Sequence, residues 1–193
     1  MIVYLWTLYT IYNKSITFLT SFAIFNYMTY NKILVPYDSS KPSEIALDHA
    51  IKIVKMSSVS SAADTTVNVI LLYVVKDIPV PATYGAGLFK SNKTGDMITL
   101  EQYLKDITLE IKTDAKKMLE ENIDKYRNIE NVSLQSQVLI GDPSDEIIKF
   151  ANDEKVDLII MGTTGLGGIK KFVFGSVAKN VSEKANCPVM LVR

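Results

Sequence analysis

Five apolar runs recur along the chain after residue 32, and each has the character of a β-strand. The run at residues 67–75 is rich in β-branched residues and almost continuously apolar, which is typical of a strand covered on both faces. The first run ends at Pro36, where the missing N–H takes the chain out of the sheet. The predicted strands span residues 33–35, 67–75, 132–140, 156–161 and 188–192.

The intervals between these runs carry apolar residues with helical spacing. In the first interval this spacing runs from Ile45 to Val54, and Pro42 suits a first helical turn with Ser40 or Lys41 as the cap. Asp142 followed by a proline has the pattern of a capped helix start. The predicted helices span residues 42–56, 97–126, 143–153 and 176–184.

The alternation of strand and helix predicts an α/β domain with a single doubly wound, five-stranded parallel sheet and helices on both faces, a Rossmann-like arrangement. Residues 76–96, which are rich in proline and glycine, are expected to be irregular. Sheets of this kind bind ligands beyond the carboxyl ends of their strands. We therefore expect the functional site after residues 36, 74 and 161.

Residues 1–27 differ in composition from the domain predicted for residues 28–193. They hold one charged side chain, Lys14, between two apolar runs that would span a bilayer only if joined. A secretory signal is the weakest interpretation, because no cleavage-site pattern follows. A membrane anchor and a start codon assigned too early, with Met28 as the true start, both remain open.

The composition of the chain excludes several functions. Its 21 basic and 21 acidic side chains give no net charge, which argues against a nucleic-acid partner. The single cysteine, Cys187, excludes an intrachain disulfide and is expected to be an inert thiol. The single histidine, His49, lies on the apolar stripe of a predicted helix, so we expect it to pack there and predict neither a catalytic triad nor a metal site.

Five of the nine glycines of the chain fall within residues 162–175, between a predicted strand and a predicted helix. Glycine lets backbone N–H groups approach an anion closely, and a helix N-terminus favours a phosphate. Lys170 and Lys171 add positive charge to this segment. It matches neither the Walker A loop nor the dinucleotide fingerprint, because Gly167 is followed by a second glycine and an isoleucine.

At these residues the chain resembles the universal stress protein family, in its ATP-binding subgroup with the signature G-x2-G-x9-G-[ST]. Gly162, Gly165, Gly175 and Ser176 have this spacing. Residues 32–38, 71–74 and 187–189 are similar to the first, second and last strands of the family. The resemblance extends over about residues 30–193 and implies a fold of the adenine nucleotide alpha hydrolase type.

The resemblance also implies a ligand, which is ATP, with or without Mg²⁺. The glycine segment would hold its ribose and phosphates, Asp38 and the Pro36 carbonyl would face ribose or adenine, and the backbone of Val74 would contact adenine. The predicted binding residues are Pro36, Asp38, Val74, Met161, Gly162, Thr163, Thr164, Gly165, Gly168, Gly175, Ser176 and Val177.

Three functions compete on this basis. We favour a regulatory, stress-response protein that binds ATP, because no metal-binding acid or general base for phosphoryl transfer is evident in the sequence. Slow ATP hydrolysis or phosphate transfer is the second hypothesis, and no catalytic residue is nominated for it. The third is an interaction module without nucleotide that is attached to a membrane.

The resemblance further implies a homodimer joined through the last strand, at Val189, Met190, Leu191 and Val192. We expect a cytoplasmic location. Membrane attachment would replace it only if residues 1–27 are translated and span a bilayer.

Overall fold

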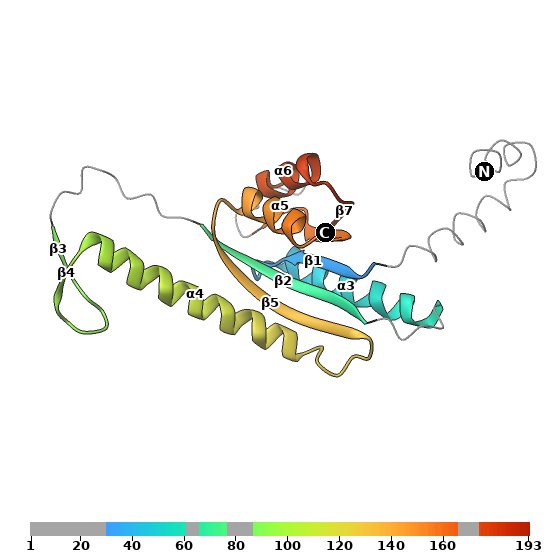
Figure 1. Cartoon of the computed structure of the whole chain (residues 1–193), viewed down its shortest axis with the longest axis horizontal. Coiled ribbons are helices and arrows are strands. Elements are labelled where there is room, and N and C mark those ends of the chain that lie inside the picture. The colour runs from blue at the N-terminus through green and yellow to red at the C-terminus, as the bar shows by residue number, and fades with distance from the viewer. Residues whose placement is uncertain (1–29, 61–65, 77–86, 166–173) are drawn as a thin grey trace, which may run out of the picture.

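The computed structural model describes residues 30–60, 66–76, 87–165 and 174–193. They form seven strands and four helices, and a helix lies between each two successive strands of the parallel sheet (Figure 1). In chain order these are β1 (Lys32–Pro36), α3 (Lys41–Ser60), β2 (Val67–Lys76), β3 (Leu88–Lys90), β4 (Met97–Thr99), α4 (Leu100–Asp124), β5 (Val132–Gly141), α5 (Pro143–Asp153), β6 (Leu158–Gly162), α6 (Ser176–Lys184) and β7 (Val189–Val192).

The five predicted strands form one parallel sheet in the order β5–β2–β1–β6–β7. From β1 the chain moves outward in one direction to β2 and β5, and then returns to the other side of β1 for β6 and β7. The winding direction therefore reverses between β1 and β6, and a crevice opens at their carboxyl ends. The predicted fold class is confirmed.

The two faces of the sheet are covered by different helices because successive strand residues point to opposite sides. Ile33 and Val35 of β1 pack in a core with apolar residues of α3 and α4. Leu34, between them, packs in a second core with residues of α5 and α6. All three β1 side chains are fully buried, as a near-continuous apolar run in a parallel sheet requires.

The helix ends follow the sequence signals for caps. The Asp142 side chain accepts hydrogen bonds from the backbone N–H groups of Ser144 and Asp145, as the predicted cap of α5 requires. Helix α4 begins three residues later than predicted, because Thr99 and Gln102 form a reciprocal capping box at its start.

The prediction that residues 76–96 are irregular is wrong in part. Lys76 is the last residue of β2, and β3 pairs with β4 in an antiparallel ladder, with Phe89 opposite Ile98. Residues 77–86 lie outside the described residues. Each of these two strands has only three residues, too few for a period of two to be visible in sequence. The Phe89 ring, which stacks on Tyr103 of α4 at 5.4 Å between centroids, ties the pair to that helix.

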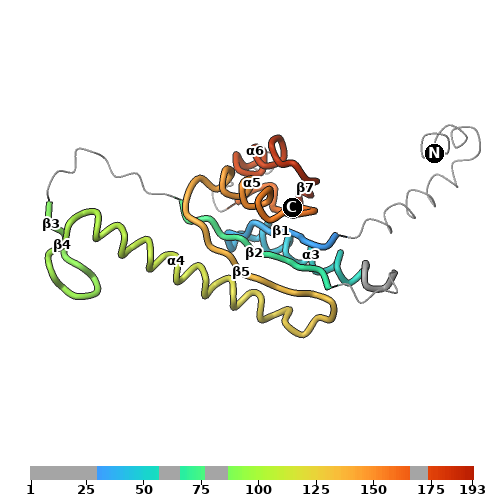
Figure 2. The backbone as a smooth tube through the Cα atoms, in the orientation of Figure 1, coloured from blue at the N-terminus to red at the C-terminus, as the bar shows by residue number. Residues whose placement is uncertain are grey.

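Helix α4 runs past the end of the parallel sheet and carries β3 and β4 at its outer end (Figure 2). Its buried residues, Ala115, Leu119 and Ile123, all lie in its second half, over the sheet.

Just beyond helix α4, the Tyr126 hydroxyl donates a hydrogen bond to Asp48 of α3. Burial and this carboxylate raise the pKa of Tyr126 to about 12.

Within the described part of the chain, no helix is both long enough and apolar enough to cross a membrane. The apolar segment 1–27, with its two open interpretations, lies outside the described residues.

Candidate functional site

A cavity of about 760 Å³ lies at the carboxyl edge of the parallel sheet. Strands β1, β2 and β6 contribute residues at their carboxyl ends, and α5 and α6 contribute their first turns. The volume is within the range of small-molecule binding sites. The cavity lies at the reversal of winding, where the alternation of strands and helices predicts a ligand.

Of the twelve predicted site residues, ten line this cavity, one lies beside it and one lies outside the described residues. Thr163 is buried beside it, where its N–H donates to Val192 and its carbonyl accepts a 2.8 Å hydrogen bond from the Gly175 N–H. Gly168 lies outside the described residues, as do Lys170 and Lys171. The ten that line the cavity are Pro36, Asp38, Val74, Met161, Gly162, Thr164, Gly165, Gly175, Ser176 and Val177.

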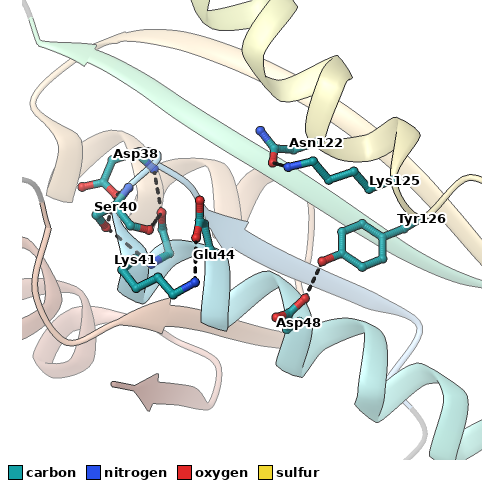
Figure 3. A network of polar contacts seen from close by, with 9 residues as sticks. Asp38, Ser40, Lys41, Glu44, Asp48, Asn122, Lys125 and Tyr126 are labelled. Carbon is teal, nitrogen blue, oxygen red and sulfur yellow. Dashed lines mark hydrogen bonds and ion pairs between the residues drawn. The ribbon is translucent and has the colours of Figure 1, made fainter.

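The turn from β1 to α3 holds Asp38 in a ring of hydrogen bonds (Figure 3). The Asp38 Oδ1 atom accepts from the Ser40 N–H at 3.1 Å and from the Ser40 hydroxyl at 2.5 Å. The Ser43 hydroxyl donates to the Ser40 carbonyl at 2.8 Å, and its oxygen accepts from the Asp38 N–H at 3.4 Å. The Asp38 carboxylate is therefore fixed by its own loop before any ligand arrives.

The backbone of this turn is strained at Ser39, which has a φ of 59°. This left-handed conformation is unfavourable for a residue with a Cβ. Here it brings Ser40 back toward Asp38, so that both Ser40 donors reach one carboxylate oxygen. Such strain persists only where the surrounding contacts enforce it, and it gathers at functional sites.

The three signature glycines that the structure describes have different surroundings. A Cβ on Gly162 would lie 2.5 Å from the Pro42 Cβ and 2.9 Å from the Pro42 carbonyl carbon, so this glycine lets α3 pack on the end of β6. A Cβ on Gly165 would lie 2.5 Å from Asp38 Oδ2. A Cβ on Gly175 would meet only ordinary contacts at 3.5 Å or more, so packing does not require a glycine there.

Helix α6 begins at the cavity with Gly175 as its cap residue, and no described side chain accepts a hydrogen bond there. Its first turn contains no acid. The N–H groups of a first helical turn have no partner within the helix, and the helix dipole makes this end positive. The start of α6, beside the Ser176 hydroxyl, is therefore suited to an anion.

The sequence analysis did not nominate ten other lining residues. Ser40 and Ser43 are buried, line the cavity and take part in the ring of hydrogen bonds that holds Asp38. Only the folded turn reveals these hydrogen bonds. Lys76, at the end of β2, is the cationic side chain among the described lining residues. Its charge also acts on Asp142, whose pKa is lowered first by the Ser144 hydroxyl and then by backbone N–H groups.

Tyr37 places an aromatic side chain against the cavity. The residue is 3% exposed, and its pKa is raised by burial and by the nearby charges of Glu44 and Asp38. The phenol therefore stays protonated and neutral. A signal for this residue was present in the sequence, since it lies between two nominated positions, Pro36 and Asp38.

Among the described residues, no group of three or more histidine, cysteine, aspartate or glutamate side chains is arranged to hold a metal ion. Cys187 is a half-buried free thiol whose pKa is raised by burial. A raised pKa lowers the thiolate fraction, which agrees with the inert thiol that the sequence predicts.

The sequence model of the universal stress protein family matches residues 29–193. The chain belongs to the universal stress protein family. The match includes every strand and helix of the described structure, and it begins just after the apolar segment 1–27.

Two curated relatives are archaeal universal stress proteins of Methanocaldococcus jannaschii. Universal stress protein MJ0577 is 35% identical over 173 residues, which include 85% of this chain and 95% of the relative. Universal stress protein MJ0531 is 34% identical over 164 residues, which include 85% of this chain and 82% of the relative.

Solved structures of the family have the same fold. The structure of MJ0577 superposes with a TM-score of 0.65 at 29% identity, covering 84% of this chain and 95% of that one. A universal stress protein in complex with cAMP gives a TM-score of 0.53 at 20% identity, covering 85% and 97% of the two chains. One from Archaeoglobus fulgidus in complex with dAMP gives 0.50 at 21% identity, covering 86% and 100%.

Proposed function

We propose that this universal stress protein is a stress-response regulator that binds ATP in the cavity at the carboxyl edge of its sheet. The observation that carries the proposal is the start of α6, which opens into that cavity without a side-chain cap among the described residues. Two family structures of the same fold contain the adenine nucleotides cAMP and dAMP, which supports the base assigned to the ligand.

The phosphate groups belong at the α6 end of the cavity. The Gly175 cap and the Ser176 hydroxyl lie there, beside Gly165. Several backbone N–H groups pointing at one oxygen cluster stabilise a negative charge, and the helix dipole adds to this effect. A triphosphate needs such donors in number, so the glycine-rich segment supports ATP as the ligand.

The adenosine moiety belongs at the β1 and β2 end of the cavity. Pro36, Val74 and Met161 supply apolar surface for a flat base, and Asp38 supplies a carboxylate for the sugar hydroxyls. A bound Mg²⁺ would be held mainly by phosphate oxygens and water, because the described residues offer no cluster of metal ligands.

Calorimetric titration of the full chain with ATP, ADP and AMP tests this assignment, and the Gly175→Glu variant locates the phosphates. A Cβ at residue 175 makes only ordinary contacts, so the variant should fold, but its carboxylate would lie where we propose that the phosphates bind. We expect the affinity for ATP to fall about a hundredfold.

The matched control is Ser182→Glu, which adds the same charge at an exposed position of the same helix. It should leave the affinity for ATP unchanged. If the wild-type chain binds no adenine nucleotide, or if Gly175→Glu binds ATP as the wild type does, the proposal is wrong.

A steady-state assay of phosphate release on the same samples separates binding from hydrolysis. We expect tight binding without phosphate release above the buffer rate, because the described residues hold no group of three or more metal-ligating side chains. Release that depends on the protein and is lost in Gly175→Glu would support a slow ATP hydrolase instead.

We also propose that two copies pair through β7 and that the protein acts in the cytoplasm. Strand β7 forms one edge of the sheet, and Val189, Met190 and Leu191 are only partly buried there. A short apolar edge strand is a surface that another strand covers readily. Light scattering on the purified chain should give twice the mass of one chain, and a strict monomer would contradict the pairing.

A further inference from the structure

The backbone of Thr163 joins two segments of the chain at the carboxyl edge of the sheet. Its N–H donates to the Val192 carbonyl at 2.8 Å, and its carbonyl accepts from the Gly175 N–H at 2.8 Å. Thr163 is 6% exposed, so water does not compete freely for these hydrogen bonds. The residue after Val192 and the residue before Gly175 are thereby brought together, and these are Arg193 and Phe174.

The side chains of Arg193 and Phe174 are in contact at the rim of the cavity. The Arg193 guanidinium carbon lies over the Phe174 ring, 6.0 Å from its centroid, as in a cation–π pair. Phe174 lines the cavity and is 51% exposed, although it is a large apolar residue. Among the described residues, no aspartate or glutamate forms an ion pair with Arg193. A positive charge that the described acids do not neutralise therefore lies beside the cavity.

The order of the strands relates Arg193 to the two ends of the nucleotide site. Strand β2 neighbours β1, β1 neighbours β6, and β6 neighbours β7. We put the adenosine at the β1 and β2 end, and the phosphates at the start of α6, which Thr163 ties to the end of β6. A phosphate chain that extends further in this direction would approach the end of β7. Arg193 directly follows β7, so it lies on the side of the last phosphate.

We propose that Arg193 binds the terminal phosphate of the nucleotide and makes the site prefer a triphosphate to a monophosphate, with Phe174 as its positioning residue. The inference rests on the proposed function, since it concerns the phosphates of the same ligand. A guanidinium group presents a flat fork of donors that matches two phosphate oxygens, and it stays charged throughout the physiological pH range. ATP reaches this group with its outer phosphates, whereas AMP ends before it.

A purely structural role of Arg193 must be separated from this one. Its guanidinium covers part of the exposed Phe174 ring, and that contact stabilises the fold whether or not a ligand is bound. Loss of the contact alone would lower the free energy of unfolding and leave the preference for a triphosphate unchanged. The ratio of the affinities for ATP and AMP therefore distinguishes the two roles.

Calorimetric titration measures the affinities of the full chain for ATP, ADP and AMP in the wild type and in Arg193→Gln. Arg193 is exposed, so the variant should fold. We expect its affinity for ATP to fall about tenfold, in keeping with the loss of hydrogen bonds between charged groups. The affinity for AMP should change by less than about twofold, and that for ADP by an intermediate factor. The preference for ATP over AMP therefore shrinks.

Three further variants make the result specific. Arg193→Lys keeps the charge without the flat fork, so it should retain only part of the preference for ATP. Phe174→Leu keeps an apolar side chain without the aromatic face, and it should weaken the binding of ATP more than that of AMP. Arg127→Gln removes the same charge from an exposed arginine that pairs with Asp124 and does not line the cavity. It should leave all three affinities unchanged.

Several outcomes would overturn the inference. If Arg193→Gln keeps the wild-type ratio of the ATP and AMP affinities, Arg193 does not bind the terminal phosphate. If Arg127→Gln changes that ratio as much, the effect comes from overall charge. If the wild type binds ATP and AMP equally, the preference is absent while the binding of adenine nucleotides stands. If it binds no adenine nucleotide, the proposed function and this inference both fail.

Discussion

Helices α5 and α6 both begin at the carboxyl edge of the sheet and both line the cavity. They differ in whether a side chain accepts hydrogen bonds from their first N–H groups. Asp142 caps α5 by accepting from Ser144 at 2.9 Å and Asp145 at 3.3 Å, and two acids lie in its first turn. Helix α6 starts at a glycine, with no acid in its first turn and, in the described structure, no side-chain cap. The fold itself satisfies N–H groups at the start of α5, whereas in the described structure no side chain does so at the start of α6, where we propose that a ligand binds.

Gly162 and Gly175, two glycines of one sequence signature, also differ in their surroundings. A Cβ on Gly162 would clash with Pro42 of α3, whereas a Cβ on Gly175 would make only ordinary van der Waals contacts. Packing therefore requires a glycine at residue 162 and does not require one at residue 175. Glycines of one sequence signature can therefore differ in how much they contribute to stability.

We expect the largest effect on the free energy of unfolding from Gly162→Ala. Its Cβ would lie 2.9 Å from a backbone atom of Pro42, which a side-chain rotation cannot relieve. The variant should lose about 3 kcal/mol of the free energy of unfolding, measured by urea denaturation. Gly175→Ala is the control and should lose less than about 1 kcal/mol, because its Cβ makes ordinary contacts. Equal losses in the two variants would remove the distinction between these glycines.

A smaller effect should follow from Asp142→Ala, which removes the cap of α5. We expect a loss of about 1 kcal/mol in the free energy of unfolding, with the affinity for ATP changed by less than about threefold. The comparison of the two helices would fail if this variant lost nucleotide binding as Gly175→Glu does, because both helix starts would then hold the phosphates.

The contribution of Asp142 should also depend on pH in a definite direction. Hydrogen bonds from Ser144 and Asp145 lower its pKa in the folded state below the ordinary value of 3.8. The stabilisation is therefore complete above that value and is lost as the pH falls through the lower folded pKa. Below pH 4 the stability difference between wild type and Asp142→Ala should shrink in urea denaturation, and a constant difference down to the acid limit would contradict this account.

The smallest effect should come from Ser39→Gly, at the turn that orients Asp38. Glycine adopts a φ of 59° without the steric cost that serine bears, although it adds entropy to the unfolded chain. We expect a net gain of about 0.5 kcal/mol in the free energy of unfolding, measured by thermal denaturation. The affinity for ATP should stay the same, because both Ser40 donors remain. A loss of stability would show that Ser39 is not strained.

The sheet and its helices were largely predictable because their signals are local. The run Val67–Lys76 is apolar over most of its length, and Asp142 precedes a proline, so the order of residues suffices to place a strand and a helix start there. The pair β3 and β4 was missed because strands of three residues carry no period. Their position depends instead on the contact between Phe89 and Tyr103.

The sequence predicted where the cavity lies better than it predicted which residues line it. Asp38, Val74 and Gly175 follow or precede elements that end at one sheet edge, so the sequence places them together. Ser40 and Ser43 gave no such signal, because hydroxyl residues near a helix start are expected as caps anyway. Thr163 was nominated as part of the glycine-rich segment, and in the structure its backbone N–H and carbonyl form hydrogen bonds within the protein.

In this chain, the order and polarity of the residues alone determined the doubly wound sheet. They also placed the glycine-rich segment after the fourth strand of that sheet. Such features depend on neighbours within a few positions, which hydrophobic spacing and turn chemistry record. The tertiary structure decided which glycine packs against Pro42, which helix starts without a described side-chain cap, and which serine orients Asp38. Those outcomes depend on distances between segments far apart in sequence or on the exact backbone of one turn, and composition and spacing do not encode them.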